Sequence, residues 1–137
     1  MIFGVDFDGT IVSGKYPEIG IELPGAIEVL KLLKNKGHKI FLYTMRGHPK
    51  EGRDLLQEAV DWLEDRGLTL DGINRSPARF STSIKQYAHV YLDDCQFNAP
   101  TRIWKGMEIY DWKQVADWLL NKDIINDLEY VDLLKNF

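Results

Sequence analysis

Two aspartates separated by one residue, Asp6 and Asp8, are the side chains of this sequence best suited to chemistry. They follow the apolar residues 2–5 and precede Gly9 and Thr10. An apolar run of this kind is typical of a buried parallel strand, and parallel sheets bind their ligands beyond the carboxyl ends of their strands. The spacing therefore predicts a functional site close to the start of the chain.

The two carboxylates suit the transfer of a phosphoryl group. Asp6 can attack phosphorus while it also binds a divalent cation, which offsets the repulsion between the attacking carboxylate and the anionic phosphate. Asp8 can protonate the departing alcohol oxygen and later accept a proton from the water that attacks the aspartyl phosphate. Gly9 allows a tight turn beside the substrate, and Thr10 can hydrogen-bond within that turn. The simpler alternative is a strand end closed by an Asx-turn.

The composition is that of an ordinary globular protein. The chain has 137 residues, of which 45% are apolar and 28% charged, and this fits a single domain over residues 1–137. A net charge of −4 and a pI near 5.3 argue against a protein that tracks an extended polyanion. The single cysteine, Cys95, leaves no partner for an intrachain disulfide. Because the sequence has neither a charged leader with an apolar segment nor an apolar run of about 18 residues, we expect a cytoplasmic protein without a membrane partner.

Strand and helix patterns alternate along the chain. Strands are predicted at residues 2–5, 39–44, 68–73, 90–92 and 107–110. Helices are predicted at residues 25–36, 51–66, 112–121 and 124–134. The last helix lies in an extra C-terminal segment, residues 123–136, and is expected to pack through Ile124, Leu128, Val131 and Leu134. This alternation predicts an α/β fold in which a mostly parallel sheet of five strands has helices on both faces.

Three polar residues stand at the ends of predicted strands. Asp6, Thr44 and Asp93 each follow an apolar run, although they are far apart in the sequence. Because the carboxyl ends of parallel strands meet at one edge of a sheet, we expect these three side chains to lie near one another.

In their order along the chain, these residues resemble the four motifs of the haloacid dehalogenase superfamily of phosphohydrolases. Those motifs are an Asp-x-Asp-Gly-Thr loop, a Thr or Ser that ends the second strand, a Lys ahead of the fourth strand, and an acidic pair at the end of that strand. Here they correspond to residues 6–10, Thr44, Lys85 and the pair Asp93 and Asp94. The resemblance covers residues 1 to about 110 and implies a Rossmann-like three-layer sandwich.

The resemblance also implies a role for each matched residue. Thr44 is expected to donate a hydrogen bond to a phosphoryl oxygen, and Lys85 to hold the phosphoryl group by its positive charge. Two adjacent carboxylates, Asp93 and Asp94, repel each other in a partly buried crevice unless a cation lies between them.

Magnesium is the expected cofactor, because it prefers oxygen ligands and keeps several waters. Its expected protein ligands are Asp6, the backbone carbonyl of Asp8 and Asp93, with Asp94 bound directly or through water. Asp8 also favours phosphate esters as substrates, since dehalogenases of this superfamily need no acid at that position.

The site is expected to lack a cap domain. Only residues 12–23 separate the first motif from the first helix, which is enough for a short flap hairpin. A site without a cap needs a bulky substrate or a neighbouring subunit to exclude water, so a homo-oligomer is a possible arrangement. In the flap, Lys15 and Tyr16 are candidates to contact the leaving group or a neighbour, and simple hairpin surface is the alternative.

Further basic residues follow the second and third predicted strands. They are Arg46, His48, Arg75 and Arg79. Side chains at this edge could bind a second anionic group of the substrate, and solvated loop charges are the alternative.

The sequence thus predicts a magnesium-dependent phosphomonoester hydrolase that forms an aspartyl phosphate and acts on a phosphorylated small molecule. One alternative is a phosphatase of nucleotide or nucleic-acid ends, which the acidic charge disfavours. Another is a binding or regulatory module that keeps the fold without turnover. The flap and the rim of the site determine specificity in this fold, so the four motifs do not identify the substrate.

Overall fold

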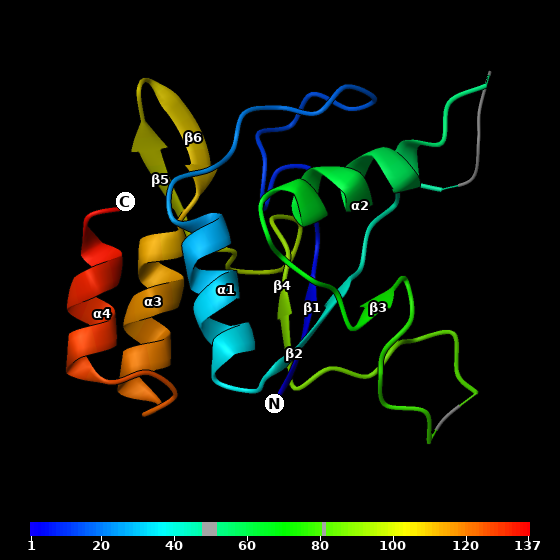
Figure 1. Ribbon diagram of the computed structural model, residues 1–137. Coiled ribbons are helices and arrows are strands. Elements are labelled where there is room, and N and C mark those ends of the chain that lie inside the picture. Colours follow the sequence, from blue (N-terminus) through cyan, green and yellow to red (C-terminus); the bar gives the residue numbers. More distant parts are fainter. Residues whose placement is uncertain (48–51, 81) are drawn as a thin grey trace.

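A parallel sheet of four strands, in the order β3-β2-β1-β4, forms the centre of the fold (Figure 1). The computed structural model describes residues 1–47, 52–80 and 82–137. The strands are β1 (Ile2–Val5), β2 (Lys39–Leu42), β3 (Gly72–Ile73) and β4 (Val90–Leu92). Our prediction of a site residue at His48 falls outside the described residues. The helix predicted from residue 51 begins later, at Leu55, because the side chain of Asp54 caps it there.

The predicted strands 2–5 and 90–92 are confirmed, whereas the predicted strand 68–73 is shorter than expected. The amide of Leu68 donates to the carbonyl of Leu63 at 3.1 Å, so this residue still belongs to the end of a helix. Pairing with β2 starts at Asp71, whose amide donates to Ile40 at 2.7 Å. After this first bond, only the last two residues of the predicted strand have strand conformation, and they form β3.

The prediction that residues 107–110 form a fifth strand of the parallel sheet is wrong. These residues form β6 (Met107–Tyr110), which pairs antiparallel with β5 (Thr101–Trp104) in a separate hairpin. Lys105 and Gly106, with φ of 48° and 77°, make the tight turn between them. Turns with two positive φ values match the twist of paired strands, so this pair of residues favours a local hairpin over a long crossover.

Four helices are present in the described residues. They are α1 (Ala26–Asn35), α2 (Leu55–Asp65), α3 (Trp112–Asn121) and α4 (Asp127–Leu134). Asp111 caps α3, so that helix begins at Trp112 as predicted, and the side chain of Asp111 accepts from the amides of Lys113 and Gln114. No helix within the described residues is long and apolar enough to cross a membrane.

One face of the sheet packs on the helices. Alternate residues of β1 and β2, including Phe3 and Leu42, share a single buried core with Leu30, Leu63 and Leu119 of the helices. The other face is covered differently, because residues 74–89 contain no helix within their described part. Lys85 of this connection lines a cavity with Gly4 and Tyr91, so a loop lies against this face.

The predicted packing of the C-terminal helix is wrong at three positions. Leu128 and Val131 are 82% and 61% exposed, and Leu134 is also exposed. A capping box between Asn126 and Glu129 begins α4 at Asp127, and in this phase Leu133 turns inward instead. Ile124, which precedes the helix, does pack against the core as predicted.

The flap, residues 12–23, closes at its base as the sequence predicts. Val12 and Glu22 form an antiparallel bridge, and the amide of Ser13 donates to the carbonyl of Ile21 at 2.8 Å. The flap and the β5–β6 hairpin both project beyond the carboxyl end of the sheet (Figure 1).

Candidate active site

Asp6 and Asp93 emerge side by side at the carboxyl edge of the sheet. Val5 is in register with Leu92, and the amide of Asp6 donates to the carbonyl of Leu92 at 2.9 Å. On the other side of β1, the amide of Tyr43 donates to Val5 at 2.8 Å. The predicted convergence is therefore confirmed for Asp6 and Asp93, while Thr44 lies one residue beyond the position that adjoins Asp6.

The carboxyl group of Asp6 is held in an environment that disfavours its negative charge. Its pKa is raised from 3.8 to about 7, mainly by burial. The charges of Asp93 and Asp94 contribute to this rise, and a hydrogen bond from the amide of Phe7 opposes it. A cation near these three carboxylates would restore the charged form of Asp6.

Thr10 and Asp94 tie the two acidic loops together. The hydroxyl of Thr10 accepts from the amide of Asp94 at 2.9 Å and donates to its carboxylate at 3.2 Å. Trp112 fixes the same turn, because its indole N–H donates to the carbonyl of Thr10 at 2.7 Å. Gly9 has φ of +84°, and a Cβ on it would lie 2.3 Å from a carboxylate oxygen of Asp94, so only glycine fits here.

Arg46 does not lie at the rim of the site, where the sequence prediction placed it. Its guanidinium is 1% exposed and donates two hydrogen bonds of 2.8 Å, from Nε and Nη2, to the two oxygens of Asp8. It also donates to the carbonyls of Leu55 and Glu18 at 3.2 and 3.1 Å. Arg46 is therefore buried because these acceptors satisfy it, and it orients Asp8 rather than facing solvent.

Thr44 is positioned by a residue that the sequence analysis missed, Asn74. The side-chain oxygen of Asn74 accepts from the amide of Thr44 at 2.8 Å, and its amide nitrogen donates to the carbonyl of Arg46 at 3.4 Å. The hydroxyl of Thr44 accepts from the amide of Arg46 at 3.1 Å, which leaves its proton free to donate. Asn74 has φ of 49°, a conformation that asparagine adopts more readily than most residues. Its place directly after a predicted strand is the only sequence signal that could have indicated it.

Lys85 shares a cavity of about 260 Å³ with Asp6 and Asp93. Its side chain is exposed, and within the described residues it forms no ion pair. The structure thus brings Lys85 to the site without a direct contact to either carboxylate.

The other predicted substrate-binding residues lie on the surface. Lys15, Arg75 and Arg79 are exposed and form no ion pair or side-chain hydrogen bond within residues 1–47, 52–80 and 82–137. Tyr16 is also exposed, and its ring lies 5.5 Å from the Arg46 guanidinium. The flap is therefore linked to the inner ion pair by an aromatic contact.

The donor set fits a hard divalent cation. Ligand atoms of Asp93, Asp94 and Cys95 lie within 4.8 Å of one another. No described residue donates a hydrogen bond to the backbone carbonyl of Asp8, so this oxygen is available as a ligand. The charges of Asp94 and Asp93 raise the pKa of the Cys95 thiol, which keeps the sulfur protonated and leaves oxygen as the dominant ligand type.

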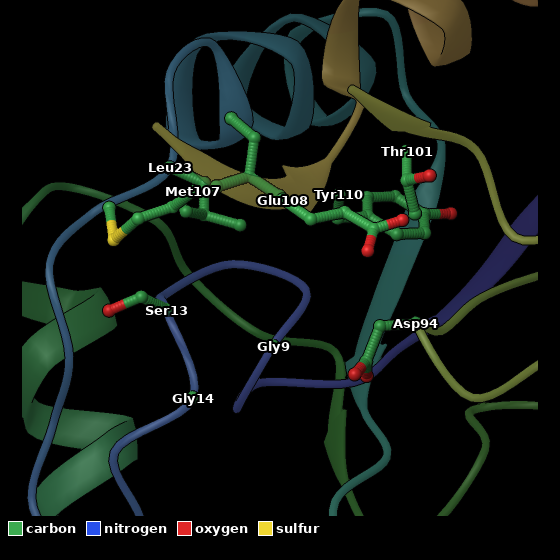
Figure 2. A pocket seen from close by; sticks show the side chains of 10 residues that line it. Gly9, Ser13, Gly14, Leu23, Asp94, Thr101, Met107, Glu108 and Tyr110 are labelled. Atoms are coloured by element: carbon green, nitrogen blue, oxygen red, sulfur yellow. The ribbon is translucent and has the colours of Figure 1, made fainter. Parts of the chain in front are cut away.

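A larger cavity of about 470 Å³ adjoins this cluster (Figure 2). Gly9 and Asp94 line it from the site, Ser13 from the flap, and Glu108 and Tyr110 from the β5–β6 hairpin. The sequence does not predict this second cavity, because its far wall is the β5–β6 hairpin and residues 107–110 were expected in the parallel sheet.

Comparison with protein-family models finds no match, and comparison with curated proteins finds none. Among solved structures, the chain is similar to the "conserved protein coded by locus from Bacteroides thetaiotaomicron". The two are 33% identical with a TM-score of 0.70, over 94% of this chain and 95% of the other. The chain therefore belongs to the same family as this Bacteroides thetaiotaomicron protein.

Proposed function

We propose that the protein is a magnesium-dependent phosphomonoester hydrolase of the haloacid dehalogenase type, as the motif resemblance implies. The convergence of Asp6 with Asp93 and Asp94 is the observation that supports this most strongly, because burial together with these two charges raises the pKa of Asp6 to about 7. Asp6 and Asp93 line one cavity and Asp94 the adjoining one, and a cation between them would offset their repulsion; Mg²⁺ takes oxygen ligands of this kind. In this proposal Asp6, the carbonyl of Asp8 and Asp93 hold the ion.

Asp6 is the proposed nucleophile. An oxygen of Asp6 bonds to phosphorus while the bond from phosphorus to the leaving alcohol oxygen breaks, and a proton from Asp8 goes to that oxygen. Water then attacks the aspartyl phosphate and gives its proton to Asp8, which releases inorganic phosphate. When bound, Mg²⁺ supplies the positive charge that lets a carboxylate approach an anionic phosphate.

Two further residues have proposed roles at the phosphoryl group. Thr44 donates through the proton that its present hydrogen bond leaves free. Lys85 reaches the phosphoryl group across the cavity that it shares with Asp6. Both donors are worth most in the transition state, where negative charge spreads over the phosphoryl oxygens.

Hydrolysis of para-nitrophenyl phosphate with and without Mg²⁺ tests this proposal. We expect Mg²⁺-dependent turnover that Asp6→Asn abolishes. Asp132→Asn is the matched control, because Asp132 is an exposed residue of α4. A zero rate in correctly folded, magnesium-loaded protein would contradict the proposal.

A second candidate, a phosphatase of nucleic-acid ends, is supported by the loop between β3 and β4. Three exposed cations, Arg75, Arg79 and Lys85, lie in this loop with two exposed aromatics, Phe80 and Tyr87. Cations that contact phosphates and aromatics that stack on bases are the usual means of binding single strands. Faster hydrolysis of a terminally phosphorylated oligonucleotide than of sugar phosphates, with a rate that falls steeply with salt, would favour this candidate.

A further inference from the structure

The cavity of about 470 Å³ between flap and hairpin, here called the flap–hairpin pocket, is lined by several polar and acidic residues. Its polar lining residues are Ser13, Asp94, Thr101, Glu108 and Tyr110. In Figure 2, Glu108 and Tyr110 lie on one side, Asp94 on the other, and Ser13 on the flap. Its volume falls in the range of about 300–1,000 Å³ that is usual for small-molecule sites.

The pocket is placed to receive the group that leaves phosphorus. Asp94 lines it, and Asp94 directly follows Asp93, which shares the cavity of about 260 Å³ with Asp6. Gly9, directly after the proposed acid Asp8, lines it as well. A molecule whose phosphoryl group lies at Asp6 can therefore extend into the flap–hairpin pocket.

The charges of the lining select against an anionic leaving group. Asp94 and Glu108 are both carboxylates, and no lysine or arginine of the described residues lines the pocket. A second phosphate or a carboxylate on the substrate would meet two like charges there. Ionised carboxylates only accept hydrogen bonds, so the ligand that fits them must donate.

The neutral residues of the lining also suit a polar ligand. Tyr110 is 2% exposed and its hydroxyl is enclosed by protein, so Tyr110 forms part of the wall and does not donate to a ligand. Alcohol groups can also pair with the hydroxyls of Ser13 and Thr101, while Leu23 supplies apolar surface for carbon atoms.

We propose that the flap–hairpin pocket binds a neutral, hydroxyl-rich leaving group of sugar size and discriminates against leaving groups that carry a second negative charge. This inference rests on the proposed function, since the phosphoryl group must lie at Asp6. The polyol departs from phosphorus with the proton of Asp8, and water returns a proton to Asp8 as inorganic phosphate is released.

A substrate pair of equal skeleton tests the inference. We would compare kcat/KM for a hexose 6-phosphate and the corresponding hexose 1,6-bisphosphate in the wild type, Glu108→Lys and Glu64→Lys. The wild type is expected to favour the monophosphate by about tenfold, and Glu108→Lys to cut this ratio by about tenfold, because it replaces a repelling charge with an attracting one. Glu64, an exposed residue of α2, is the matched control and should keep the wild-type ratio.

The outcomes separate the two proposals. The inference about the pocket is overturned if the wild type uses both hexose phosphates equally and Glu108→Lys leaves the ratio unchanged. Hydrolysis of para-nitrophenyl phosphate that depends on Asp6 would still support the proposed function. If that hydrolysis is absent, the function fails. The dissociation constants of the two hexose phosphates, measured by calorimetry, then test the proposed ligand preference of the flap–hairpin pocket. Weaker binding of the monophosphate than of the bisphosphate would overturn that preference.

Discussion

Arg46 holds Asp8 through two hydrogen bonds of 2.8 Å, from a guanidinium that is almost fully buried. The pair joins the loop after β2 to the loop after β1, and the same guanidinium donates to Glu18 of the flap. One side chain thus couples the proposed acid, the loop that carries Thr44 and the flap. Because both oxygens of Asp8 accept from the same planar fork, Arg46 fixes the position and the orientation of that carboxylate.

Replacement of this arginine should damage stability and turnover together. In Arg46→Met the carboxylate of Asp8 keeps its partly buried position without a partner, and loss of one member of a buried pair typically costs about 3 kcal/mol. We also expect kcat to fall by about a hundredfold, in line with the usual contribution of a positioned acid or base. Urea denaturation and steady-state kinetics measure the two effects.

The more conservative Arg46→Lys separates charge from geometry. Lysine keeps the positive charge but lacks the planar fork, so stability should recover more than kcat does. Arg53→Met is the control, because Arg53 pairs with Glu18 and Glu58 at the surface, and it should resemble the wild type in both measurements. Full kcat in Arg46→Lys would contradict the positioning role.

Gly9→Ala should disrupt the site beyond the ordinary cost of a methyl group at positive φ. A Cβ at Gly9 would lie 2.3 Å from Asp94, whereas one at Gly37, with φ of +86°, would meet nothing within 4 Å. Gly37→Ala therefore measures the backbone strain alone, about 1 kcal/mol. We expect a larger loss of stability in Gly9→Ala, together with loss of activity. Equal stability of the two variants would contradict the close approach of Gly9 and Asp94.

The raised pKa of Asp6 predicts an unusual dependence of stability on pH in metal-free protein. The folded state binds the Asp6 proton up to about pH 7, whereas the unfolded chain releases it near 3.8. The contribution to stability is therefore complete below 3.8 and disappears as pH rises through 7. A pKa change of this size corresponds to about 4 kcal/mol at most, and partial solvation of the group reduces the expectation to about 2 kcal/mol.

Urea denaturation in EDTA between pH 5 and 8.5 measures this loss. Asp6→Asn cannot titrate and should remove that part of the pH dependence. Mg²⁺ binds the charged carboxylate, so at a hundred times its dissociation constant it should stabilise the wild type by about 2.7 kcal/mol at pH 8 and by less at pH 5.5. Equal stabilisation by Mg²⁺ at both pH values would argue against Asp6 as a ligand.

The apolar runs in the sequence were sufficient to predict the residues at the ends of the parallel strands. The apolar runs of β1 and β4 end at Asp6 and Asp93, and parallel pairing alone brings these residues together. The inward turn of Arg46 could not be predicted, because an arginine is buried only where acceptors from distant segments converge on it. In the same way, Asn74 gained its role from a bond to Thr44, 30 residues away in the sequence.

The β5–β6 hairpin shows what the sequence pattern could not predict, namely which strand pairs with residues 107–110. Residues 107–110 were correctly predicted as a strand, but strand propensity does not specify a partner. The Lys105-Gly106 turn selects the adjacent strand β5, and the hairpin then forms one wall of the flap–hairpin pocket. Because the pairing of residues 107–110 was predicted wrongly, the flap–hairpin pocket could not be predicted either.

Thr10→Val should weaken metal binding without a large change of shape. Valine has nearly the volume of threonine but lacks the hydroxyl that bonds both the amide and the carboxylate of Asp94. Because Thr10 is fully buried, the amide of Asp94 then loses its partner, at a cost of about 2 kcal/mol. With Asp94 less firmly held, we expect the affinity for Mg²⁺ to fall about tenfold, the low end for loss of a residue that orients a ligand.

Thermal denaturation and titration calorimetry with Mg²⁺ measure the two effects in Thr10→Val, and Thr69→Val, at an exposed position, is the matched control. Stability that falls while Mg²⁺ affinity stays at the wild-type value would mean that Thr10 supports the fold alone. A fall in both would mean that the hydroxyl transmits order from the turn after β1 to the acidic pair after β4, and that these two loops act as one ligand set.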